Sequence, residues 1–110
     1  MGLPNAEAAR IEADKLEGYL LSETHPVGKF KAKFFRGVGF AESNVDVLLH
    51  GLLAIARSEE VIETLSSVHG VKYVVDGVIP APFGARVKLR TVWIIDQGED
   101  RPRFVTAYPV

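Results

Sequence analysis

The sequence predicts an α+β fold, in which N-terminal helices precede a four-stranded antiparallel sheet. Apolar residues recur every three to four positions in the first half of the chain, and the period changes to two after Glu59. Short turn-forming stretches separate the alternating segments, so consecutive strands are expected to pair as hairpins. Because a chain of 110 residues supports one hydrophobic core, residues 1–110 are expected to form a single domain.

The first helix is expected after an irregular or extended lead-in over residues 1–12, in which Leu3 and Ile11 provide apolar anchors. The helix runs from Lys15 to Leu21, with Asp14 as its cap. It ends before Pro26, because a residue that precedes proline avoids the helical conformation.

Two longer helices follow. One is expected from Val27 to Gly37, and its buried stripe is predicted by residues at four-residue spacing, namely Phe30, Phe34 and Val38. The other is expected from Val45 to about Ser58, and either Ser43 or Asn44 can cap it. Its apolar positions follow the helical period: Val45, Leu48, Leu49, Leu52, Leu53 and Ala56.

The four strands are expected at Val61–Leu65, Lys72–Ile79, Arg86–Ile95 and Arg103–Tyr108. In the third strand, Thr91 and Trp93 share a face with Val87 and Leu89. In the last strand, simple alternation predicts that Phe104, Thr106 and Tyr108 share one face.

Composition narrows the function classes. The chain has no cysteine, which removes disulfides, thiolate catalysis and thiolate metal sites. The three histidines lack metal-ligand spacing, and there is no phosphate-binding or dinucleotide-binding glycine motif, so we expect neither a metal nor a cofactor. No signal peptide or membrane-spanning run is visible, and we expect a cytoplasmic protein that does not bind membranes.

The chain is nearly neutral, with a net charge of −1 and a pI of about 6.3. A protein that binds nucleic acid without specificity is usually far more basic. The charge is unevenly distributed, however, because residues 26–40 carry four cations and no acid. This distribution predicts a local positive patch.

An imidazole precedes that basic run at the expected start of the second helix, in His25-Pro26-Val27-Gly28-Lys29-Phe30-Lys31. His25 is the candidate general acid or base, because histidine exchanges protons near neutral pH. Lys29 is the candidate for stabilising a negatively charged transition state, and Lys31 for binding phosphate. The alternatives are that His25 caps the helix or completes a turn, and that the lysines form a solvated face.

The two last strands supply hydroxyls, an indole and arginines. Thr106 and Tyr108 are candidates for holding phosphate or sugar oxygens, the alternative being packing at a sheet edge. The candidates for substrate binding in this region are Thr91, Trp93, Arg101 and Arg103. Trp93 could stack a base on an open sheet face, but packing in the core is the favoured interpretation. Thr91 could simply suit a strand, and the arginines could solubilise the hairpin.

Together, Leu3-Pro4-Asn5-Ala6-Glu7, His25-Pro26-Val27-Gly28-Lys29, Thr91-Val92-Trp93-Ile94 and the ending Pro102-Arg103-Phe104-Val105-Thr106-Ala107-Tyr108-Pro109 resemble an uncharacterised bacterial domain family. That family includes small stand-alone proteins and C-terminal modules of phage head-morphogenesis proteins. The layout and the Thr-x-Tyr-Pro ending are similar to the barnase–EndoU–colicin–RelE-like superfamily of metal-independent ribonucleases. The resemblance implies a toxin that is held by an antitoxin or immunity protein.

Three hypotheses follow. In the first, the protein is a ribonuclease toxin that cleaves RNA by attack of a ribose 2′-hydroxyl on the adjacent phosphate. In the second, the same fold is a non-catalytic module that binds RNA or a protein. In the third, the chain is the neutralising member of a toxin pair, with the acidic stretch from Glu42 to Glu63 imitating phosphate. The RNA target and the oligomeric state do not follow from the sequence.

Overall fold

The computed structural model describes residues 1–110 and contains one antiparallel sheet in the order β1-β2-β3-β4. The strands are β1 (Val61–Ser67), β2 (Gly70–Pro80), β3 (Arg86–Asp96) and β4 (Arg103–Pro109). Each strand pairs with the next one in sequence. The helices all precede the sheet, and the predicted α+β fold with its four-stranded antiparallel sheet is therefore confirmed.

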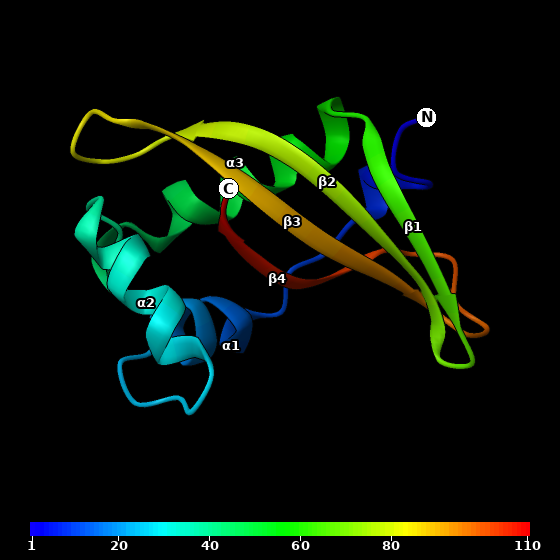
Figure 1. Ribbon diagram of the computed structural model, residues 1–110, viewed down its shortest axis with the longest axis horizontal. Helices are drawn as coiled ribbons and strands as arrows, with labels where there is room; N and C mark the ends of the chain where they lie inside the picture. Colours follow the sequence, from blue (N-terminus) through cyan, green and yellow to red (C-terminus); the bar gives the residue numbers. More distant parts are fainter.

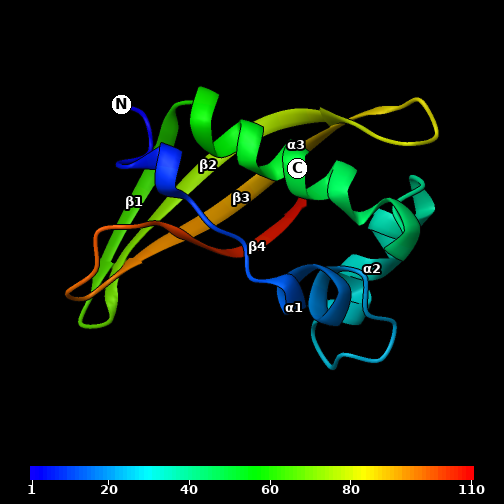
Figure 2. The same cartoon turned by 180° about the vertical axis from the view of Figure 1, so that it is seen from behind.

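The helical part lies on one side of the sheet and beside β4 (Figure 1). Its elements are η1 (Ala6–Ala8), α1 (Ala13–Lys15), η2 (Leu16–Leu20), α2 (Gly28–Gly37), η3 (Glu42–Asn44) and α3 (Val45–Ser58). The long helix α3 crosses one face of the sheet (Figure 2). No helix covers the opposite face, which we call the open face (Figure 1).

The hydrophobic core lies between α3 and the covered face of the sheet. Helix α3 buries Leu48, Leu52, Ile55 and Ala56, much as its apolar period predicts. The largest side chains that the sheet contributes to this core are Trp93, Phe104, Ile79 and Leu89. No single helix is long and apolar enough to cross a membrane. Helix α2 and residues 42–58 reach that length and apolar content only when they are taken together, and the two segments are bent by 69° relative to each other.

The lead-in before α1 ties the two edges of the sheet to the rest of the molecule. The carbonyl of Met1 accepts the N–H of Val61 at 2.8 Å, at the start of β1. At the other edge, Arg10 pairs with Arg103 through flanking backbone bonds of 3.0 and 2.9 Å. Leu3 is buried, as expected for an anchor.

The first helix differs from the prediction at its start. It begins at Ala13, and Asp14 lies inside its first turn instead of capping it, because the chain is still extended at Glu12. After one turn it widens into the π-helical turn η2, which closes with the N–H of Leu21 donating to the carbonyl of Leu16 at 2.8 Å. Single π-turns of this kind are frequent at functional sites.

The buried stripe predicted for α2 is wrong at Phe30. Phe30 is 73% exposed, and the face of α2 that is buried consists of Gly28, Ala32 and Phe35. These residues also follow the helical period, and the small side chains of Gly28 and Ala32 let α2 approach η2 closely. Phe34 and Val38 lie at the margin of the core.

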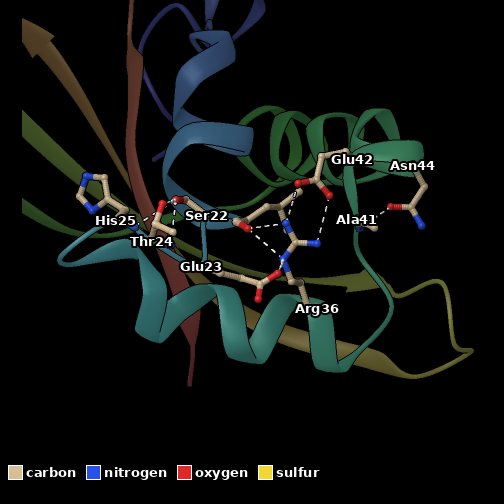
Figure 3. Close-up of polar contacts among 9 residues, drawn as sticks. Ser22, Glu23, Thr24, His25, Arg36, Ala41, Glu42 and Asn44 are labelled. Carbon is tan, nitrogen blue, oxygen red and sulfur yellow. Dashed lines mark hydrogen bonds and ion pairs between the residues drawn. The ribbon is translucent and has the colours of Figure 1, made fainter.

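The predicted caps of α3 are also wrong, because neither Ser43 nor Asn44 places a side chain on its first N–H groups. Instead, Asn44 accepts the N–H of Ala41 at 2.8 Å and donates to the carbonyl of Gly39 at 3.0 Å. Its side chain therefore closes the loop between α2 and α3 (Figure 3).

A β-bulge in β4 overturns the predicted alternation of that strand. Phe104 pairs with Trp93, but Thr106 pairs with Val92, so Val105 is an extra residue. Phe104 consequently faces the core, whereas Thr106 and Tyr108 lie on the open face with Val92 and Arg90. An extra residue shifts every later side chain to the other face of the sheet.

Candidate functional site

A polar pocket of about 470 Å³ lies at the edge of β4, where η2 and the loop before α2 meet the strand. Its lining residues are Asp14, Lys15, Gly18, Tyr19, His25, Val27, Val105 and Thr106. The structure thus brings together two of the predicted site residues, His25 and Thr106, although they are distant in sequence. We call this hollow the edge pocket.

Tyr19 is the centre of the edge pocket. Its hydroxyl lies 3.1 Å from the hydroxyl of Thr106. The His25 ring meets the Tyr19 ring edge to face, with centroids 5.0 Å apart. Two ammonium groups flank the same ring: the Nζ atoms of Lys15 and Lys31 lie 5.2 and 5.5 Å from its centroid.

These neighbours alter the acidity of the phenol. Partial burial acts to raise the pKa of Tyr19, but the hydrogen bond with Thr106 and the ammonium groups of Lys31 and Lys15 outweigh it, and the pKa lies below the ordinary value of 10.0. Positive charge and a hydrogen-bond donor both stabilise the phenolate. Tyr19 is therefore the strongest candidate acid or base in the pocket.

Local packing holds Tyr19 in place. The buried side chains of Leu16 and Leu20 anchor η2 on either side of it. Gly28 of α2 lies against Tyr19 so closely that a Cβ atom there would collide with the Tyr19 carbonyl oxygen. Lys15 is oriented by the bulge in β4, because its Nζ atom donates to the carbonyl of Val105 at 3.3 Å.

His25 is held by the start of α2. Its Nδ1 atom accepts the backbone N–H groups of Val27 and Gly28 at 3.0 and 2.9 Å. An imidazole nitrogen that accepts hydrogen bonds carries no hydrogen, so the neutral ring carries its proton on Nε2. Nε2 has no partner within the protein and remains free for a ligand. His25 therefore caps the helix, which was the alternative to an acid or base role in the sequence analysis. Its side chain also lines the edge pocket.

The loop that carries His25 is fixed by two polar side chains (Figure 3). The hydroxyl of Ser22 accepts the N–H of Thr24 at 3.3 Å and that of His25 at 3.1 Å. From α2, Arg36 donates to the carbonyl of Leu21 at 2.9 and 2.6 Å. The same guanidinium pairs with the carboxylates of Glu42 and Glu23, as Figure 3 shows.

The open face continues from the edge pocket through Thr106 to Tyr108. Tyr108 is paired in register with Arg90 of β3. Arg90 in turn donates to both carboxylate oxygens of Asp76, at 2.9 and 3.0 Å. These hydrogen bonds lower the pKa of Asp76, against a smaller opposing effect of burial. Tyr108 is thus near the pocket but outside its lining.

The other predicted cations occupy different surroundings. Lys29 lines a second cavity, with Lys33 and Phe30, on the outer side of α2. Arg103 donates to both carboxylate oxygens of Asp96, at 2.7 and 3.0 Å, which lowers the pKa of Asp96. Arg101 is exposed and donates to the carbonyl of Ala8 at 3.2 Å.

Thr91 and Trp93 are fully buried. The indole N–H donates to the Thr91 hydroxyl at 2.8 Å, and that hydroxyl donates to the carbonyl of Val75 at 2.6 Å. The structure places both residues in the core, and their side chains do not reach the open face.

Tyr19, Lys15 and Arg90 do not figure among the residues predicted from sequence. The signal for the first pair is the spacing of four between Lys15 and Tyr19, which places them on one side of a helix. That spacing is common on solvated helices, so it does not indicate a site unless the position of the neighbouring strand is known.

No group of three or more His, Asp or Glu side chains comes together to hold a metal ion.

The fold and site define a small α+β protein with an uncovered sheet face and a polar pocket at the edge of its last strand. Residues 2–110 match the family described as Domain of unknown function (DUF6883), and the chain belongs to that family. A comparison with curated proteins finds no match.

Among solved structures, the chain is similar to one from a complex described as "Contact-dependent growth inhibition toxin - immunity protein complex from Klebsiella pneumoniae 342". The TM-score is 0.72 at 17% sequence identity, and the alignment covers 91% of this chain and 98% of the other. At that identity the likeness demonstrates a shared fold.

Proposed function

We propose that the protein is a metal-independent endoribonuclease of a toxin system, with the edge pocket as its active site. One observation carries the proposal: a tyrosine with a lowered pKa lies 3.1 Å from the Thr106 hydroxyl and beside the imidazole of His25. The ammonium groups of Lys15 and Lys31 lie 5.2 and 5.5 Å from the centroid of the Tyr19 ring. Cleavage of a phosphodiester by its own ribose needs a base, hydrogen-bond donors and positive charge.

In the proposed reaction, the Tyr19 phenolate accepts the proton of the ribose 2′-hydroxyl. The 2′-oxygen bonds to phosphorus, the bond from phosphorus to the 5′-oxygen breaks, and the 5′-oxygen takes a proton from solvent water at the open side of the pocket. His25 keeps its Nε2 hydrogen and donates a hydrogen bond from it to a phosphoryl oxygen. The ammonium groups of Lys15 and Lys31 stabilise the extra negative charge of the transition state.

The predicted residues other than His25 have supporting roles in this proposal. Thr106 keeps the phenol acidic by donating to it, and Tyr108 lies two residues further along the open face for contact with the substrate backbone. Arg103 is at the far end of the same face, although Asp96 occupies its donors. The fold shared with one chain of a toxin–immunity complex supports a cognate protein partner, which in this proposal is an inhibitor.

The first test is cleavage of RNA by the purified protein with divalent metals chelated. We expect products that end in a 2′,3′-cyclic phosphate. Tyr19→Phe keeps the ring but removes the base, so the rate should fall by about 10²- to 10⁴-fold. Tyr73→Phe is the matched control, because Tyr73 packs against the core away from the edge pocket. Equal rates for the two variants would refute the role of Tyr19.

Two variants of His25 separate its structural role from its chemical one. In His25→Asn, the Oδ1 atom takes the place of Nδ1 and can still cap α2, but no group replaces the Nε2 donor. His25→Ala loses both. We expect both variants to lose most of the cleavage rate, and only His25→Ala to lose stability, by about 1 kcal/mol. Full activity in His25→Asn would reduce His25 to a helix cap.

The rival function is a non-catalytic module or the neutralising partner of a toxin. Two observations favour it: the Nδ1 atom of His25 is committed to the helix, and the chain has a net charge of −1. A third observation opposes the neutralising role. Within the acidic stretch that was proposed to imitate phosphate, the Glu42 carboxylate is already paired with the Arg36 guanidinium. Protein that leaves RNA intact but suppresses the toxicity of a co-expressed nuclease would establish this rival.

A further inference from the structure

An exposed aromatic ring on α2 lies in a cationic hollow that the proposed reaction does not use. Phe30 is 73% exposed, and it lines a cavity of about 550 Å³. The other lining residues are Glu23, Lys29, Lys33 and Arg36. A phenylalanine this exposed presents most of its ring to solvent, so the ring is available for stacking against a ligand.

Of the three cations around Phe30, two are free to bind a ligand and one is already paired. Arg36 is bonded to Glu42, Glu23 and the carbonyl of Leu21. In contrast, neither Lys29 nor Lys33 has a carboxylate within 4.0 Å among the ion pairs of the structure. The Lys29 ammonium lies 5.3 Å from the centre of the Phe30 ring. The hollow therefore offers an aromatic surface and two free positive charges.

This hollow adjoins the edge pocket along the chain. Val27 lines the edge pocket, and Phe30 comes three residues later, about 4.5 Å further along a helix axis. Lys31, the next residue, points back to the Tyr19 ring. The N-terminal turn of α2 thus separates two hollows, and a flexible anionic chain that occupies one can extend into the other.

We infer that Phe30 stacks a base of single-stranded RNA next to the phosphate in the edge pocket, while Lys29 and Lys33 bind the phosphates that flank that base. This inference rests on the proposed function. Stacking of a base on an aromatic ring, with cations along the backbone, is how single strands are bound without strict sequence preference. An exposed ring flanked by two unpaired lysines favours a strand in which bases alternate with phosphates over an acidic patch on a folded partner, because only the strand uses both the ring and the charges.

The test measures binding of a 2′-O-methyl RNA oligonucleotide, which lacks the attacking hydroxyl and so stays intact. We expect Phe30→Ala to weaken binding roughly 5- to 100-fold, and Phe30→Trp to preserve it. Phe83→Ala is the matched control, because Phe83 is 77% exposed in the turn between β2 and β3. Lys29→Gln should weaken binding and make its salt dependence shallower by about one phosphate contact.

Each outcome decides the inference separately from the proposed function. If Phe30→Ala binds like Phe83→Ala, or if the wild type does not bind the oligonucleotide, the stacking site is refuted, even when the protein cleaves RNA. If Phe30→Ala loses binding while the wild type cleaves nothing, the stacking site holds and the nuclease proposal fails. Loss of affinity for a protein inhibitor alone would refute the inference in favour of a protein-docking surface.

Discussion

Adding one methyl group at Gly28 probes the contact that positions the candidate site. A Cβ atom at this position would overlap the carbonyl oxygen of Tyr19 and lie 2.9 Å from both its carbonyl carbon and its ring atom Cδ1. Two of these three neighbours are backbone atoms, which cannot rotate away. Relief of the clash therefore requires α2 and η2 to separate.

The magnitude follows from two opposing effects. Alanine is favoured over glycine in a helix by about 0.5–1 kcal/mol. Overpacking costs about 1–3 kcal/mol, and the upper part of that range applies because the clash is with backbone. We expect Gly28→Ala to lower the free energy of unfolding by about 1–2.5 kcal/mol, measured as a lower urea midpoint at unchanged slope.

Gly37→Ala is the matched control, at the other end of the same helix. A Cβ atom there meets nothing within 4 Å. Only the helix preference remains, so the free energy of unfolding should rise by as much as about 1 kcal/mol. The two substitutions should therefore have opposite signs. If Gly28→Ala also stabilises the protein, the close contact between Gly28 and the Tyr19 backbone is refuted.

Three other predictions address the core, the open face and the edge pocket. Thr91→Val leaves the buried indole N–H unpaired and should cost about 1–3 kcal/mol of unfolding free energy, whereas the exposed Thr64→Val should change it by less than about 0.5 kcal/mol. The pKa of Asp76 is lowered in the folded state, so Asp76→Asn should destabilise the protein at neutral pH, with the difference vanishing as the pH falls through that pKa. Thr106→Val should raise the pKa of Tyr19, measured by tyrosinate absorbance, because the phenolate loses a donor.

Contrary results would each remove one argument. Equal stability of the two threonine variants in urea would show that the buried hydrogen-bond chain contributes nothing. A destabilisation by Asp76→Asn that persists in acid would mean that the Arg90 ion pair is not its cause. An unchanged tyrosinate titration in Thr106→Val would disconnect the Thr106 hydroxyl from the acidity of the edge pocket.

The sequence predicted the elements of secondary structure well, because their signals are local. The period of two after Glu59 and the turns between its segments predicted every strand. The apolar residues of α3 recur so regularly that its bounds and most of its buried face were predicted. The burial of Trp93 agrees with the favoured interpretation of a large indole in an apolar strand.

The local signals failed where a contact between elements decides the outcome. Both stripes of α2 follow the helical period, and only the close approach of η2 selects the one with Gly28 and Ala32. That choice leaves Phe30 in solvent. The bulge at Val105 has no sequence signal, yet it determines which face carries Thr106 and Tyr108.

The sequence by itself determined the fold class, the order of the strands and the basic segment that begins at His25, since periodicity, turn residues and charge are properties of short stretches. Only the tertiary structure decided the composition of the candidate site. Tyr19 and Thr106 are separated by 87 residues, and their hydroxyls meet because η2 packs against the bulged edge of β4. A lowered pKa needs charges and donors close in space, and distance along the chain carries no information about that closeness.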